Sequence, residues 1–185
     1  MGQIAAALVV GNAVIAKPAL QTAILAHRIT DLGYRCGIPK GVWQTVFADI
    51  EVSSALTKAP GIHGVLFTGS TQTARTINQT LAARAGPIIP LVAETGGLNA
   101  MLVDSTALPE QVVQDVLISA FQSAGQRCSA LRVLYLQDDI ADDVITMLKG
   151  AMQMRRVGHP SHRDTDIGPI IDRTALDKLQ KHQAY

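Results

Sequence analysis

Short apolar segments rich in Val and Ile alternate with amphipathic segments in the first half of the chain. The apolar segments cover residues 12–17, 42–47, 64–67 and 88–94. Helical periodicity fills the intervals, over residues 21–32, 50–58 and 71–84. This alternation predicts an α/β fold with a Rossmann-like parallel sheet and helices on both faces. Ligands of such sheets bind beyond the carboxyl ends of the strands.

The pattern changes after Gly96 and Gly97. Strands are predicted over residues 100–103 and 132–137, and helices over residues 109–122, 138–154 and 173–182. Pro109 suits the first position of its helix. We therefore expect residues 1–95 to be part of a Rossmann-like, nucleotide-binding domain and residues 96–185 to be part of a second α/β domain, which contains Cys128.

Composition narrows the possible partners. The 185 residues are 48% hydrophobic and carry a formal net charge of +1, without the basic cluster that nucleic acid binding needs. A small-molecule partner is therefore expected. The apolar runs are far shorter than the roughly 20 residues that span a bilayer, and the first residues lack a basic signal region. These features favour a cytoplasmic protein.

The two cysteines, Cys36 and Cys128, lie too far apart for a metal knuckle, and no metal site is predicted. Cys36 is expected to be a small, semi-buried apolar residue of a loop. Cys128 stands in a turn of small residues beside Arg127 and before Arg132, which could favour its thiolate. It is a candidate nucleophile, and the alternative is a cysteine buried beneath the turn.

Glu94 ends the last apolar strand of the first half and is followed by Thr95 and two glycines. A carboxylate at this edge of the sheet, if buried, would have a pKa raised toward that of a general base. The alternative is a strand-end carboxylate that only accepts hydrogen bonds from the glycine turn.

Residues 67–71 close a short strand and open a helix, which is favourable for a phosphate at Gly69, Ser70 and Thr71. The spacing is not the Gly-x-Gly-x-x-Gly fingerprint, so Ser70 or Thr71 could equally be an N-cap only. Lys17 ends the first strand on the expected ligand edge. Its alternative is a solvated lysine.

Four segments, residues 11–19, 67–71, 94–97 and 125–128, resemble successive motifs of the aldehyde dehydrogenase superfamily. The resemblance continues through residues 157–160 and 166–171. Longer stretches, residues 93–101, 107–113 and 119–132, resemble the L-glutamate γ-semialdehyde (pyrroline-5-carboxylate) dehydrogenase module of the bifunctional proline utilisation A proteins.

This resemblance implies an oxidation that forms a cysteine thioester, with Cys128 as the nucleophile and Glu94 as the base for its hydrolysis. NAD is the implied cofactor. Lys17 would contact the adenosine ribose, and Ser70, with its neighbours Gly69 and Thr71, would contact the pyrophosphate. The Thr95 backbone would contact the nicotinamide end. Ser129 would help to hold the substrate carboxylate. Leu20 stands where relatives usually carry Glu, which leaves the choice between NAD and NADP open.

The resemblance also implies partners. A proline dehydrogenase module would occupy the same polypeptide and hold FAD, which is not expected to bind here. A homo-oligomer is expected, in the cytoplasm or peripheral to the inner membrane. The oxyanion asparagine of the family would lie upstream of Met1, and further conserved parts after Tyr185, so the 185 residues read as an internal fragment.

Two other functions remain open at this point. The chain could belong to an aldehyde dehydrogenase with another substrate, because the shared chemistry does not select the acyl chain. It could also be a noncatalytic fragment that at most binds nucleotide, and the isolated chain is expected to be inactive.

Overall fold

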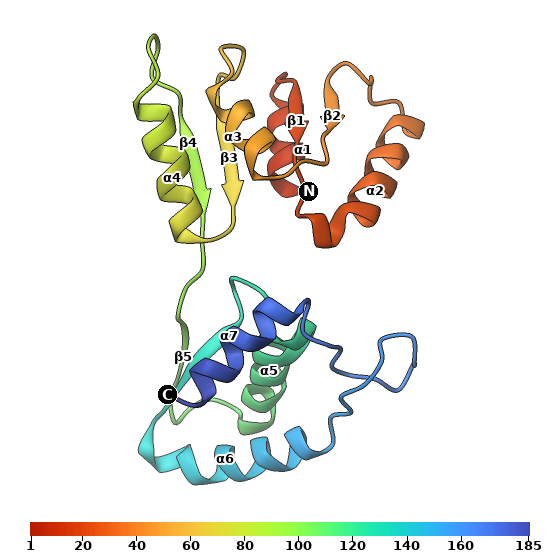
Figure 1. Cartoon of the computed structure of the whole chain (residues 1–185). Helices are drawn as coiled ribbons and strands as arrows, with labels where there is room; N and C mark the ends of the chain where they lie inside the picture. Colours follow the sequence, from red (N-terminus) through yellow and green to blue (C-terminus); the bar gives the residue numbers. More distant parts are fainter. The chain divides into compact units, whose positions relative to one another are not determined.

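The computed structural model describes residues 1–185, which form two compact units, Met1–Thr95 and Gly96–Tyr185 (Figure 1). The division falls directly after Glu94 and Thr95.

The first unit contains short parallel strands and the helices between them. Its elements in order are α1 (Gly2–Val9), β1 (Val14–Ala16), the 3-10 turn η1 (Leu20–Thr22), α2 (Ala23–Arg35), β2 (Trp43–Thr45), α3 (Ile50–Lys58), β3 (Val65–Thr68), α4 (Thr71–Ala82) and β4 (Leu91–Glu94). The predicted helix over residues 50–58 coincides with α3, and the other elements differ from prediction at their ends. Helix α1 was not predicted, because a run of alanines favours a helix without giving an amphipathic pattern.

The strands of the first unit form two separate pairs. β1 pairs in parallel with β2 and β3 with β4, and each pair is a two-stranded sheet. The parallel sheet predicted for this unit is therefore divided into two strand pairs. The parallel pairing through helical crossovers is present, as expected for an α/β fold.

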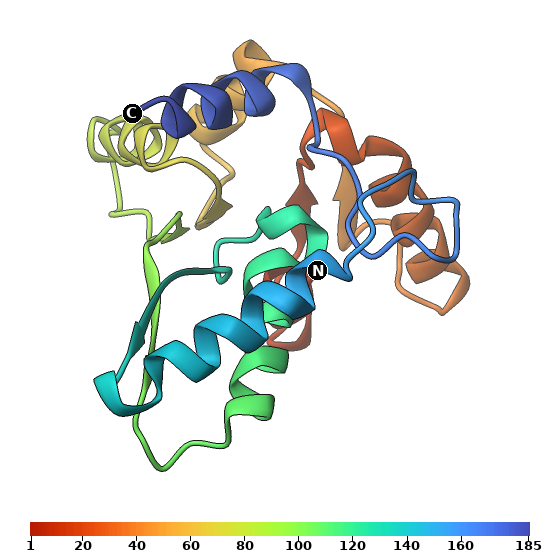
Figure 2. The same ribbon diagram turned by 90° about the horizontal axis from the view of Figure 1, so that it is seen from below.

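The second unit is built around one parallel strand pair. It contains β5 (Asn99–Val103), α5 (Pro109–Phe121), the 3-10 turn η2 (Gln122–Gly125), β6 (Leu131–Leu136), α6 (Asp138–Gln153) and α7 (Arg173–Gln183). β5 and β6 pair in parallel with an irregularity after Asn99. Between α6 and α7 the chain forms a long loop, residues 154–172, without a regular helix or strand (Figure 2).

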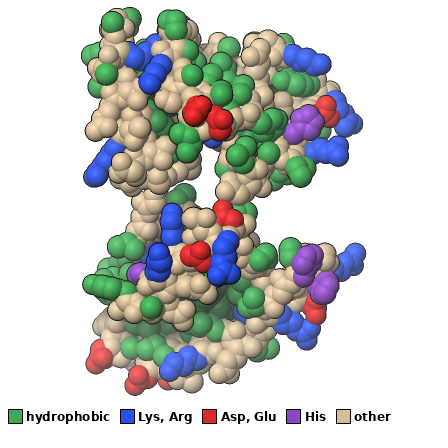
Figure 3. All heavy atoms as spheres, viewed as in Figure 1, with side chains coloured by type: hydrophobic (Ala, Val, Ile, Leu, Met, Phe, Trp, Pro, Cys, Tyr) green, Lys and Arg blue, Asp and Glu red, His purple; other side chains and the backbone are tan.

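Buried apolar side chains are concentrated in the second unit. One cluster joins β5, α5, β6 and α6 through Val103, Val112, Val113, Val116, Leu117, Leu131 and Val144. The buried apolar residues of the first unit are Trp43, Ala48, Ala74 and Leu81. Groups of hydrophobic side chains are visible on both units on the face drawn in Figure 3. Two strand residues of the first unit, Leu66 and Val92, are almost half exposed.

Candidate active site

Cys128 lies in a tight turn between η2 and β6, and its side chain is exposed. The chain enters this turn through three consecutive residues with positive φ, Ser123 (57°), Ala124 (54°) and Gly125 (65°). A Cβ at Gly125 would lie 2.7 Å from the Ala120 carbonyl oxygen, so only glycine fits. The alternative of a cysteine buried beneath the turn is wrong.

Two side chains hold the backbone around Cys128. The Asn99 amide nitrogen donates to the carbonyl oxygens of Cys128 (2.7 Å) and Ala130 (2.9 Å). The Arg132 guanidinium donates to the carbonyl oxygens of Gly125 (2.7 Å) and Arg127 (3.4 Å). The carbonyl groups on both sides of the thiol are thereby fixed.

The arginines do not act on the thiol in the way that the sequence suggested. Arg127 donates to the Ile118 carbonyl oxygen at 3.0 Å, and Arg132 donates to the carbonyl oxygens of Gly125 and Arg127. Neither guanidinium forms a hydrogen bond with the Cys128 sulfur, so their direct contribution is to the shape of the turn. Cys36 is also exposed, so the expectation of a semi-buried residue is wrong. The reason is that Cys36 directly follows the last turn of α2, where the chain enters a surface loop.

Gln126 ties this turn to the loop before α7. Its amide nitrogen lies 3.3 Å from the Pro169 carbonyl oxygen, and its amide oxygen accepts from the Ile171 N–H at 2.8 Å. These contacts form a two-point anchor from one side chain to a distant backbone segment.

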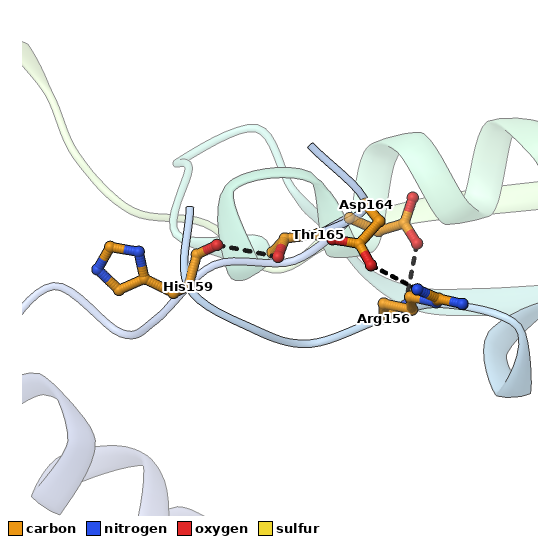
Figure 4. Close-up of polar contacts among 5 residues, drawn as sticks. Arg156, His159, Asp164 and Thr165 are labelled. Carbon is orange, nitrogen blue, oxygen red and sulfur yellow. Dashed lines mark hydrogen bonds and ion pairs between the residues drawn. The ribbon is translucent and has the colours of Figure 1, made fainter. Parts of the chain in front are cut away.

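The loop that leads to this anchor is closed by its own polar contacts. Arg156 pairs with Asp164, and the Thr165 hydroxyl donates to the His159 carbonyl oxygen (Figure 4). The Arg156 N–H also donates to Asp166 at 2.9 Å. This backbone hydrogen bond, with a smaller contribution from Arg155, holds the pKa of the Asp166 carboxyl below its usual value.

Glu94 ends β4 beside the end of β3. Its backbone carbonyl accepts from the Gly69 N–H at 3.0 Å, so two site candidates share a hydrogen bond. The Glu94 side chain is exposed, and its carboxylate receives no hydrogen bond from the glycine turn. The burial that was expected at this strand end is thus not present, because Glu94 is the last residue of a short strand pair with little packing around it.

Ser70 is the N-cap of α4. Its hydroxyl oxygen accepts from the Thr73 N–H at 3.1 Å and lies 2.9 Å from the Thr73 hydroxyl, while Thr71 is the first helical residue. Gly69 packs against the Phe67 ring, and a Cβ there would lie 2.5 Å from that ring, so a larger residue would have to displace it. The capping function is present, and it leaves the first N–H groups of the helix available to an anion.

The remaining predicted residues lie at element ends. Lys17 follows β1 directly and is exposed, Thr95 follows β4 and is partly buried, and Ser129 is exposed beside Cys128. The structure thus places the thiol and Ser129 on one turn of the second unit. It places Glu94 beside Gly69 in the first unit.

Comparison with known proteins gives the family. The model described as "Aldehyde dehydrogenase family" matches residues 1–185. The chain belongs to the aldehyde dehydrogenase family. The resemblance seen in its motifs is confirmed.

Relatives of this aldehyde dehydrogenase chain are longer proteins. It is 52% identical to "Bifunctional protein PutA" of Klebsiella aerogenes, over 98% of the chain but 14% of that relative. It is 31% identical to "1-pyrroline-5-carboxylate dehydrogenase" of Anoxybacillus flavithermus, over 98% of the chain and 36% of that relative. A crystal structure of a variant of Bradyrhizobium japonicum Proline Utilization A (PutA) matches with a TM-score of 0.92 at 53% identity, over 99% of the chain and 19% of that structure.

Two residues around Cys128, Asn99 and Gln126, were not singled out by the sequence patterns. Asn99 begins a strand and Gln126 stands inside the thiol motif, and both were quoted only as parts of motifs. A polar side chain at the start of an otherwise apolar strand was the available signal for Asn99. No local signal identifies the partner of Gln126, which lies more than 40 residues away.

Proposed function

We propose that this chain carries the nucleophile and the general base of an NAD-dependent enzyme that oxidises L-glutamate γ-semialdehyde to L-glutamate in proline catabolism. The observation that carries the proposal is an exposed cysteine in a backbone turn held by side chains, within a chain of the aldehyde dehydrogenase family. The names of the relatives, PutA and 1-pyrroline-5-carboxylate dehydrogenase, supply the substrate class.

The chemistry follows from the two groups. The Cys128 thiolate adds to the aldehyde carbon and forms a hemithioacetal. Bound NAD would supply the acceptor for the hydride that leaves this carbon. Glu94 then takes a proton from a water molecule, whose oxygen attacks the thioester carbon, and the thiolate leaves as the acid forms. Cys128 is exposed and therefore accessible to the aldehyde, and the Glu94 carboxylate is exposed and makes no hydrogen bond, so it is accessible to water.

The residues of the first unit fit a dinucleotide. The start of α4 offers unpaired backbone N–H groups to a pyrophosphate, at Ser70 and Thr71 after Gly69. Lys17 offers an exposed ammonium group to the ribose. Thr95 would meet the nicotinamide end through its backbone. Residues 1–95 would then be the nucleotide-binding part and residues 96–185 the thiol-bearing part.

A second substrate is favoured by one further relative. "N-succinylglutamate 5-semialdehyde dehydrogenase" of Novosphingobium aromaticivorans is 37% identical over the whole chain and 39% of that relative. Both aldehydes present a carboxylate, which Ser129 would hold in our proposal. A noncatalytic fragment that only binds nucleotide is the alternative from another class.

The relatives suggest the partners. We propose that the same polypeptide contains a proline dehydrogenase module with its own FAD, that it assembles as a homo-oligomer, and that it is located in the cytoplasm or at the inner membrane surface. None of the helices has the length and apolar character needed to cross a membrane.

The test compares aldehydes in the full-length polypeptide that contains these residues. NADH formation is measured with L-glutamate γ-semialdehyde, N-succinylglutamate 5-semialdehyde and acetaldehyde, and repeated with NADP. We expect the highest kcat/KM with the first aldehyde and NAD. A higher value with another aldehyde would change the substrate, and NAD binding without turnover would support the binding module.

A further inference from the structure

The turn that carries Cys128 depends on side chains for its shape. Three residues that precede it have positive φ, a conformation that costs free energy at Ser123 and Ala124. Within the turn, the Ala130 N–H donates to the Arg127 carbonyl oxygen at 3.1 Å. Asn99 binds the carbonyl oxygens of Cys128 and Ala130, and Arg132 binds those of Gly125 and Arg127.

Asn99 has the geometry to control two peptide groups at once. Both of its donated hydrogen bonds come from one amide nitrogen, to the carbonyls of Cys128 and Ala130. The two bonded carbonyl groups lie on either side of Ser129 in the sequence. Its partly buried position at the start of β5 fixes the donor, and Gly97 lies close enough that a Cβ there would be 3.4 Å from the Asn99 side-chain oxygen.

A bulge places Arg132 on the same turn. Asn99 pairs with Leu131 and Ala100 with Val133, so Arg132 is the extra residue of β6. Bulges redirect a side chain without ending the strand. Here the redirected guanidinium reaches the carbonyls that precede the thiol, while Asn99 takes those that follow.

The sulfur itself has no hydrogen-bond partner, so its position follows from the backbone. One torsion separates the Cys128 backbone from Sγ, and it has only staggered minima. A fixed peptide on each side therefore limits the direction of the thiol. We propose that Asn99 is a positioning residue that aligns Cys128 for attack on the aldehyde, with Arg132 supporting the other side of the turn.

This inference rests on the proposed function and makes a separate prediction. Asn99→Leu removes the donors at similar size, and Asn99→Ser keeps one shorter donor. The matched control is Asn78→Leu, at an exposed position of α4 where the side chain makes no hydrogen bond. All variants are made in the full-length polypeptide.

A misplaced nucleophile costs about 10²-fold in rate. We therefore expect kcat to fall by about that factor in Asn99→Leu with KM little changed, and to be partly restored in Asn99→Ser. Alkylation of Cys128 by iodoacetamide should stay close to that of the unaltered protein, because an exposed thiol reacts with a small reagent without alignment. The Asn78 variant should match the unaltered protein in both measurements.

The outcomes separate the two proposals. An unchanged kcat in Asn99→Leu would overturn the positioning role, and so would an equal loss of turnover and alkylation, which would indicate a collapsed turn. If Asn99→Leu does not fold, the Asn99→Ser variant decides by the same criteria. Absence of turnover in the unaltered protein, or full turnover in Cys128→Ala, would instead overturn the proposed function.

Discussion

In the second unit, α5, α6 and the strand pair bury one continuous cluster, and Val144 at its centre is fully buried. In the first unit, the strand pairs are separate, and Leu66 and Val92 remain 44% and 49% exposed. The turn that carries Cys128 adjoins the continuous buried cluster, whereas the proposed dinucleotide-binding residues lie at the ends of the partly exposed strand pairs. The difference shows that Cys128 is positioned by a packed core and by the hydrogen bonds of Asn99 and Arg132, whereas Lys17 is placed only by the end of a short strand.

The largest expected effect is on turnover, and it distinguishes the proposed base Glu94 of the first unit from the proposed nucleophile Cys128 of the second. In the full-length polypeptide, Glu94→Gln should slow thioester hydrolysis by about 10²- to 10⁴-fold, because water then lacks its general base. A burst of NADH should persist in rapid-mixing experiments. Cys128→Ala should show no burst. Loss of the burst in Glu94→Gln would mean that Glu94 acts before hydrolysis or is structural.

The next effect concerns stability. Val144→Ala should destabilise the second unit by about 2 kcal/mol, because it removes two methyl groups from a fully buried site. Leu66→Ala should cost about 1 kcal/mol or less in the first unit, since the side chain is already partly exposed. Hydrogen exchange at β6 and β3 amides measures the two effects separately. Equal losses would remove the contrast between the cores.

A smaller effect is expected on cofactor affinity. Ser70→Ala and Lys17→Ala should each weaken NAD binding about tenfold, as expected for a lost hydrogen bond to a charged or polar group. Titration calorimetry measures this. Asp49→Ala removes the equivalent N-cap of α3, where Asp49 accepts from the Val52 N–H at 2.9 Å. It serves as the control for the cost of a lost cap. Unchanged affinity in both site variants would place the dinucleotide elsewhere.

The smallest effect is in the loop of Figure 4. The pKa of Asp166 is lowered by the Arg156 N–H, so its contribution to loop order is fully present above the usual carboxyl value of 3.8. The contribution is lost as the pH falls from that value through the lowered pKa. The Arg156 amide, followed by NMR, should exchange faster with solvent in that range. Asp166→Asn should remove this pH dependence. A transition that persists in the variant would have another cause.

Local sequence patterns predicted most of the elements because helices and buried strands carry their own periodicity. The helix over residues 50–58 has a capping aspartate and an amphipathic face, and its limits agree with the structure. Helix α1 has neither signal. The separation of the strand pairs could not be predicted either, since the apolar pattern of one strand does not determine which other strand it pairs with.

The sequence predicted where the candidate residues lie in the secondary structure. Glu94 ends β4, Ser70 is the N-cap of α4, and Cys128 lies in the turn before β6. The supporting contacts were not predicted, because Asn99 and Gln126 bind backbone groups that are distant in sequence. Arg127 and Arg132 were expected to favour the thiolate because they are close to Cys128 in sequence. Their guanidinium groups instead donate hydrogen bonds to backbone carbonyl oxygens.

The most direct test of the nucleophile is to trap the acyl group on the protein. Full-length Glu94→Gln protein is mixed with L-glutamate γ-semialdehyde and NAD, quenched in acid, digested and examined by mass spectrometry, with Cys36 as the internal control. Both thiols are exposed, so access alone does not distinguish them. We predict a thioester on the peptide that contains Cys128 and none on the peptide that contains Cys36. An acylated Cys36, or a burst of NADH with no acyl group on Cys128, would contradict the account.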